Sequence, residues 1–219
     1  MVPIFPLPET VLFPLVEVSL HLFEPRYRQM GEDVIAGDGY LVMALLESGW
    51  QEDYEGDPPV HEIATLGRVI EHDRLDDGRY DIVLRGERRV RLEPPVDGNE
   101  HPNARLYRMR PFEPAPESSE ASAEAAVLRD RLGRLWSELL RHRGGRGPSL
   151  PPEPLSFPEQ VNRIASGADI PADAMQSLLE EDSLETRGQK LATLLEERLL
   201  FWRQLTSYRR TKPDDPSRN

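Results

Sequence analysis

Hydrophobic positions change their spacing near residue 113, and this change predicts two kinds of structure in one chain. Before that point, residues 16–22 alternate apolar and polar side chains with a period of two, which is typical of a half-buried strand. Residues 40–46 form a continuous apolar run, which favours a strand buried on both faces. The first half is therefore predicted to consist mainly of strands.

The same patterns predict further strands at residues 63–72, 80–85, 88–92 and 104–112. The Asp76-Asp77-Gly78 sequence is a hairpin signal between the first two of them, because glycine tolerates the positive φ that tight turns need. Gly86 is expected to separate the next two. Most of the first half is thus predicted to form one set of short strands joined by turns.

A single helix is predicted within this strand-rich half, over residues 24–36. Phe23, Tyr27, Met30 and Val34 recur at a spacing of three to four, which places them on one apolar face. Such a face is normally buried, so Phe23 and Tyr27 are expected to be core residues rather than contact residues.

The second half has the 3.6-residue period of helices. Residues 113–124 are rich in Pro, Ser, Ala and Glu and predict a linker. A helix with an apolar stripe through Trp136 follows. Ser156 is predicted to cap a second helix, Pro171 opens a third, and a long last helix carries its stripe through Leu195, Leu199 and Trp202. This stripe predicts a hydrophobic seam between the two halves.

These patterns predict an α+β fold with two lobes. We expect a β-rich lobe with one helix at residues 1–116 and a helical bundle lobe ending in a long helix at residues 117–211. Residues 212–219 are predicted to be a disordered tail, because they are polar and terminal.

Charge and composition narrow the function classes. The 219 residues include no cysteine, and the net charge is −12 with a pI near 5.0. Most of the acidic excess lies before Pro116, and such a field repels phosphate backbones, so we expect no nucleic-acid partner. No run of eighteen apolar residues and no secretion signal is present, so we expect no membrane partner and a cytoplasmic location.

The sequence lacks the patterns that indicate a catalytic site. The string from His61 to Thr65 begins like a zinc-protease helix, but Thr65 stands where the second histidine is required. Lys190 follows no glycine-rich phosphate loop, and neither Lys190 nor Lys212 is placed as a desolvated catalytic lysine. The sequence therefore predicts no enzyme, no metal and no cofactor.

One basic cluster leaves two interpretations open. Arg85, Arg88, Arg89 and Arg91 lie together, and Arg89 and Arg91 share one face of a predicted strand. They could form an anion or RNA site. We favour a solvated sheet face on which the arginines pair with nearby acids.

Several strings of residues resemble the Lon protease N-terminal (substrate-binding) domain family. The opening strings are Ile4-Phe5-Pro6-Leu7-Pro8, Val11-Leu12-Phe13-Pro14 and Leu20-His21-Leu22-Phe23-Glu24-Pro25-Arg26-Tyr27, and the later ones cover residues 65–69, 77–86, 89–92 and 178–182. The resemblance extends over roughly residues 2–206. The first motif is specific, whereas the helical leucine pattern alone is weak.

The resemblance implies a PUA-like pseudo-barrel lobe followed by a helical lobe. It also implies binding of unfolded or degron-bearing protein segments, which full Lon proteases pass to an ATPase and a serine-lysine protease. The expectation is a stand-alone, non-catalytic bacterial module that acts as an adaptor in proteolysis or quality control, with a protease as a partner. The alternative is an RNA-binding module on the same scaffold. The client and the oligomeric state are left open.

Two groups of residues are candidates for protein binding. Residues 47–61 form a long acidic loop with Trp50 and Tyr54, which could anchor a client or fold back as a lid on the barrel. Arg26 and Arg28 lie near the start of the predicted first helix. The hypothesis is that a client segment docks between this loop and this helix.

Overall fold

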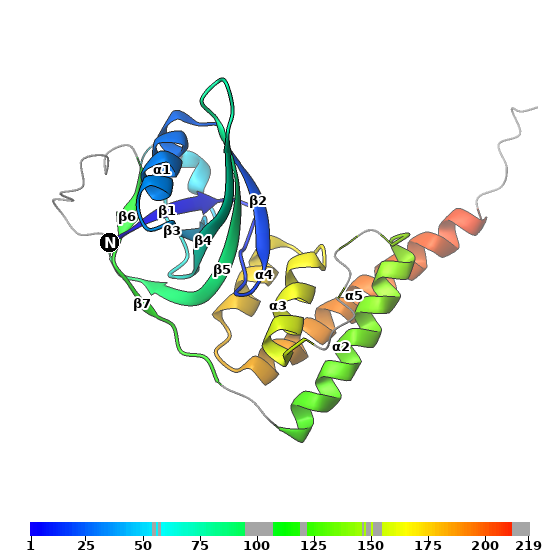
Figure 1. Ribbon diagram of the computed structural model, residues 1–219. Coiled ribbons are helices and arrows are strands. Elements are labelled where there is room, and N and C mark those ends of the chain that lie inside the picture. The colour runs from blue at the N-terminus through cyan, green and yellow to red at the C-terminus, as the bar shows by residue number, and fades with distance from the viewer. Residues whose placement is uncertain are drawn as a thin grey trace, which may run out of the picture.

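The computed structural model describes residues 1–53, 56, 58–94, 107–118, 122–145, 147, 150 and 155–211 of the chain. Its first half is rich in strands and its second half is helical, so the predicted α+β class is confirmed (Figure 1). Tyr54, residues 104–106 of the strand predicted at 104–112 and the tail predicted at 212–219 lie outside the described residues.

The strands form one strongly coiled sheet in the order β2-β5-β4-β3-β1-β6, and β7 also pairs with β5. They are β1 (Val2–Leu7), β2 (Glu17–Leu22), β3 (Tyr40–Leu45), β4 (Ile63–Arg74), β5 (Tyr80–Leu92), β6 (Met109–Arg110) and β7 (Phe112–Pro114). Only the β1–β3 pair is parallel among the pairs in the described part of the chain. β2 and β6 are therefore the ends of this strand order.

Gly86 does not separate two strands, as the sequence suggested, but lies inside β5. A Cβ atom there would come within 2.3 Å of the Phe13 carbonyl oxygen. The Gly86 N–H donates to the carbonyl of Val16 at 2.8 Å, and its own carbonyl accepts from the Leu15 N–H at 2.8 Å. Glycine is thus needed because the segment before β2 crosses β5 closely, not because the strand turns.

The helix α1 (Pro25–Ala36) follows β2 directly and covers one face of the sheet. Pro25 fits its first turn, where a missing N–H costs nothing. Tyr27 is buried as predicted, and its ring meets Phe5 of β1 edge-on at 4.8 Å between centroids. The core prediction is wrong for Phe23, which is 60% exposed. Phe23 precedes the helix and stacks on His21 instead, with ring centroids 6.1 Å apart.

The described residues of the second lobe contain four helices: α2 (Ala123–His142), α3 (Phe157–Gly167), α4 (Ala172–Glu180) and α5 (Leu184–Thr211). The predicted cap of α3 is present, since the Ser156 hydroxyl accepts from the Glu159 N–H at 3.4 Å. α5 runs alongside α2 and extends beyond it (Figure 1). No described helix is long and apolar enough to span a membrane.

A shared hydrophobic cluster joins the two lobes, as the sequence predicted. It combines Val11, Phe13, Leu45 and Ile63 of the first half with apolar residues of the helices. The stripe of α5, including buried Leu195 and Leu199, belongs to this cluster but packs mainly against α2.

Two buried arginines accompany this apolar joint. The Arg89 side chain is 1% exposed and donates to Asp182 at 2.7 Å and to the carbonyl of Pro116 at 2.6 Å. Arg187 is 0% exposed and pairs with Glu117 at 2.7 Å. Burial lowers the pKa of Arg187, and the carboxylate of Glu117 opposes that shift. The predicted solvated face is therefore wrong for Arg89, because the turn before α5 covers its end of β5.

Candidate functional site

Arg26 and Arg28, both predicted as contact residues, make contacts within the molecule. Arg26 Nε donates to Glu24 Oε2 at 3.0 Å, and its guanidinium lies over the Tyr27 ring, 4.7 Å from the centroid. Arg28 Nη1 donates to the carbonyl oxygen of Asp77 at 3.2 Å. Arg28 thereby ties α1 to the turn between β4 and β5.

Trp50 lies in a short 3₁₀ helix, η1 (Trp50–Asp53), and is partly buried. It packs against the cluster that contains Val42, whereas α1 packs against the cluster that contains Leu41. Neighbouring residues of a strand point to opposite faces, so Trp50 and the arginines of α1 belong to opposite faces of β3. The structure does not bring these candidates into one cluster, and Tyr54 lies outside the described residues.

A polar chain connects the end of β2 with the following hairpin. His21 Nδ1 lies 2.6 Å from Asp81 Oδ1, and Arg79 Nη1 lies 3.0 Å from His21 Nε2. A guanidinium can only donate, so Nε2 accepts and the Nδ1–H donates to Asp81. Arg79 also donates to Asp77 Oδ2 at 2.7 Å, and the backbone and side-chain hydrogen bonds from Arg79 lower the pKa of Asp77.

A hollow of about 450 Å³ lies on the outer face of the sheet beside these hydrogen-bonded side chains. Ser19 and His21 of β2, Asp81 of β5, and Glu71 and Asp73 of β4 line it. Its lining thus carries three carboxylates, and the cross-strand register brings them together. The alternation in residues 16–22 predicted an exposed face, but sequence alone did not indicate which strands would lie beside it.

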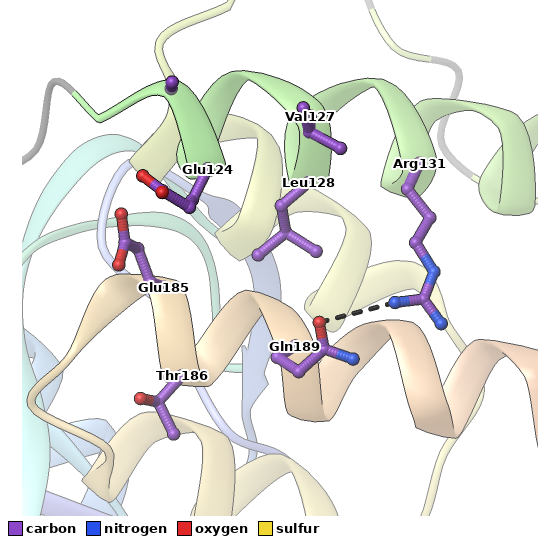
Figure 2. Close-up of a pocket in the computed structure, with 8 residues that line it drawn as sticks. Glu124, Val127, Leu128, Arg131, Glu185, Thr186 and Gln189 are labelled. Atoms are coloured by element: carbon purple, nitrogen blue, oxygen red, sulfur yellow. Dashed lines mark hydrogen bonds between the residues drawn. The ribbon is translucent and has the colours of Figure 1, made fainter.

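The helical lobe has a larger groove, of about 580 Å³, between the first turns of α2 and α5 (Figure 2). Leu128 of α2 points into the space between the helices and is buried. Val127 is 69% exposed, although it is a large apolar side chain. The groove therefore offers an apolar wall to solvent. The apolar spacing of the sequence predicted the α2 stripe but not the role of Val127, which lies beside it.

Charged groups border this groove unequally. Glu124 and Glu185 point towards each other from the two helices at one end (Figure 2). The Ser122 hydroxyl donates to Glu185, whereas Glu124 has no ion pair in the part of the chain that the structure describes. Arg131, at the other end, donates to Glu196 at 2.7 Å and to Gln189 at 3.3 Å. The groove thus combines an apolar wall with a negative end.

The structure divides the basic cluster considered from the sequence, because Arg89 is buried whereas Arg85, Arg88 and Arg91 reach solvent. Arg89 is buried in the joint between the lobes. Arg91 is exposed and pairs with Glu62 at 3.2 Å and, more loosely, with Glu113 at 3.9 Å. The favoured interpretation, a face paired with nearby acids, therefore holds for Arg91. Within the described residues, no group of three histidines, aspartates or glutamates has the arrangement of a metal site.

The coiled sheet, the helical lobe and their surface grooves define a two-lobed α+β protein. The family model for the ATP-dependent protease La (LON) substrate-binding domain matches residues 1–197, and the chain belongs to this family. The resemblance drawn from the sequence is confirmed.

Curated relatives agree with this assignment. Lon protease 2 of Sorangium cellulosum is 28% identical over 169 residues, which cover 77% of this chain and 20% of that protein. The Lon protease of Citrifermentans bemidjiense is 28% identical over 193 residues, which cover 84% of this chain and 23% of that protein. This chain spans about a fifth of the length of the curated relatives it matches.

Two solved structures share the fold. The N-terminal domain of a Mycobacterium avium complex Lon protease is 16% identical, with a TM-score of 0.66, and the match covers 90% of this chain and 98% of that one. The Lon N-terminal domain protein from Xanthomonas campestris is 22% identical, with a TM-score of 0.58, covering 88% and 96%. The predicted order of a sheet lobe followed by a helical lobe is thus confirmed as a Lon N-terminal fold.

Proposed function

We propose that this protein binds unfolded or degron-bearing segments of other proteins and does so without catalysis. The observation that carries the proposal is the match of residues 1–197 to a substrate-binding domain. We propose further that the protein acts as an adaptor, which passes the bound segments to a protease.

The groove between α2 and α5 is the surface that we assign to this binding. Val127 and Leu128 form its apolar wall. An apolar client side chain that packs on this wall would leave water and would cover the exposed side chain of Val127. A client lysine or arginine beside Glu124 and Glu185 would meet two carboxylates of opposite charge. The preferred client therefore carries an apolar residue close to a basic one.

A fluorescence anisotropy titration tests this proposal. The probe is a labelled protein that is kept unfolded by reduction and carboxymethylation, and the same protein in its folded form is the comparison. We expect the unfolded probe to bind and the folded one not to bind.

The substitution Val127→Asp should lower affinity for the unfolded probe by about tenfold, because it places a charge on the apolar wall. Val127 is exposed, so its loss should change stability little. Ser137→Asp adds the same charge to an exposed site of α2 outside the groove and should leave affinity unchanged. Equal affinity of both variants and the wild type would place binding elsewhere.

A further inference from the structure

The strand β2 is an unprotected edge of the sheet. It is the first strand in the order β2-β5-β4-β3-β1-β6 and pairs only with β5 among the described residues, and Figure 1 shows it on the outer side of the sheet. The opposite end of the order, β6, has only two residues, whereas β2 has six. A six-residue edge can accept a further strand, and a two-residue edge offers little to pair with.

The hydrogen-bond pattern shows which backbone groups of β2 are available. The Gly86 N–H donates to the carbonyl of Val16, and the register continues without a shift from Glu17 to Leu22. In an antiparallel pair, alternate residues bond to the partner. Val18, Leu20 and Leu22 therefore bond to β5.

The backbone N–H and C=O groups of the other residues of β2, Glu17, Ser19 and His21, point away from β5. None of the three takes part in another backbone hydrogen bond within the described part of the chain. They form a row of donors and acceptors at the spacing that an added strand would use.

β2 also lacks the features that usually prevent edge pairing. Its sequence, Glu17 to Leu22, has no proline, lysine or arginine, and its pairing with β5 has no bulge. The side chains of Glu17, Ser19 and His21 are exposed on the outer face. Those of Val18 and Leu20 are only partly buried on the inner face.

Charge indicates what kind of strand would pair there. The hollow beside β2 is lined by the carboxylates of Asp81, Glu71 and Asp73. Within β2 itself, histidine aside, Glu17 is the one charged residue. A second copy of this chain would bring like charges together, and each copy carries a net charge of −12. A basic segment would instead meet opposite charge.

We infer that the free edge of β2 binds an extended client segment by adding it as a strand, and that this segment alternates basic and apolar residues. Its basic side chains lie on the outer face and reach the carboxylates of the hollow, while its apolar side chains cover the exposed parts of Val18 and Leu20. This inference rests on the proposed function, because it describes how one class of client is held.

A short labelled peptide in which lysine and valine alternate is the probe for this inference. The wild-type protein should bind it, and added salt should weaken binding because charge pairs contribute. The same peptide with every backbone amide N-methylated keeps its side chains but cannot donate, so it should bind at least about tenfold more weakly.

Two variants of β2 provide a matched pair. Ser19→Pro removes an N–H that points away from β5, so the sheet keeps its own hydrogen bonds while the added strand loses one. We expect the affinity for the lysine-valine peptide to fall by roughly tenfold. Ser19→Ala keeps the N–H and should bind the peptide as the wild type does.

Amide hydrogen exchange on the wild-type protein keeps the test independent of how Ser19→Pro folds. Peptide binding should slow exchange at Glu17, Ser19 and His21, whose amides β5 does not protect. Absence of binding, or binding without this protection, would overturn the inference. The proposed function would still stand if the unfolded probe bound and Val127→Asp weakened that binding.

Discussion

Arg89 shows how a single residue can connect the two lobes. It lies on β5, yet its guanidinium donates to Asp182 and to the carbonyls of Pro116 and Glu180, all of which lie after the sheet. The alternation of β5 placed Arg89 and Arg91 on one face correctly, but the sequence carried no signal that α4 and α5 would cover one of the two. Burial by a distant element is invisible to local periodicity.

The substitution Arg89→Ala should reduce the free energy of unfolding by about 2–4 kcal/mol, because two carbonyl oxygens lose a buried donor and a cavity is left. Arg91→Ala, two residues along the same strand, removes only exposed ion pairs and should change stability little. Urea unfolding of both variants measures the difference. Equal losses would show that Arg89 does not hold the joint.

Tyr107 gives a second prediction for a single residue. Its hydroxyl donates to Asp33 Oδ2 of α1 at 2.5 Å, and burial together with this bond raises its pKa above the usual value of 10.0. The contribution of the neutral hydroxyl is therefore fully present below pH 10 and is lost as the pH rises towards the higher folded-state pKa.

Wild-type stability should accordingly fall as the pH is raised above about 10. In Tyr107→Phe this part of the decline should be absent, because no hydroxyl remains to ionise. Thermal unfolding at a series of alkaline pH values measures both proteins. Identical pH dependence would mean that Tyr107 ionises equally easily in the folded and unfolded states.

Helices were easier to predict than the partners against which they pack. Caps and apolar stripes are local features, so the Ser156 cap and the stripe of α5 could be identified from sequence. The pairing of α5 with α2 joins residues that lie far apart in the sequence, such as Arg131 and Glu196, and could not be predicted from local patterns. For the same reason, the seam was predicted to lie along α5, whereas Phe13 and Ile63 of the sheet lobe help to form it.

The pair of helices predicts unequal roles for their two tryptophans. Trp136 of α2 is 1% exposed, and Trp136→Ala should cost about 3–5 kcal/mol. Trp202 lies in the second half of α5 and is only partly buried. Trp202→Ala should therefore reduce the free energy of unfolding clearly less than Trp136→Ala does. Melting temperatures of the two variants test this order, and a larger loss for Trp202 would contradict the packing described.

The whole molecule combines surfaces that the patterns of the sequence predicted only in part. The Lon family motif predicted the fold and the class of ligand. The structure then separated Trp50 from Arg26 and Arg28 and revealed the α2–α5 groove instead. Grooves arise where elements distant in sequence meet, so neither Val127 nor Glu185 could be assigned to one beforehand.

We predict that the protein neither hydrolyses ATP nor cleaves bound clients. Lys190 is exposed, and its Nζ donates to Glu181 Oε2 at 2.7 Å, a bond that lowers the pKa of Glu181. An exposed lysine held by a carboxylate is not the desolvated lysine that a serine-lysine dyad requires. Mass spectrometry of an unfolded client after incubation tests this prediction, and cleavage abolished by one substitution in this chain would contradict it.

Hydrogen exchange across the whole chain, with and without a saturating unfolded protein, tests client binding most directly. We predict slower exchange at the start of α2 and of α5, where the groove lies, and no change when the same protein is folded. Protection of both helix starts by the unfolded form alone would support the proposed function. Unchanged exchange at these helices in the presence of a saturating unfolded client would contradict it.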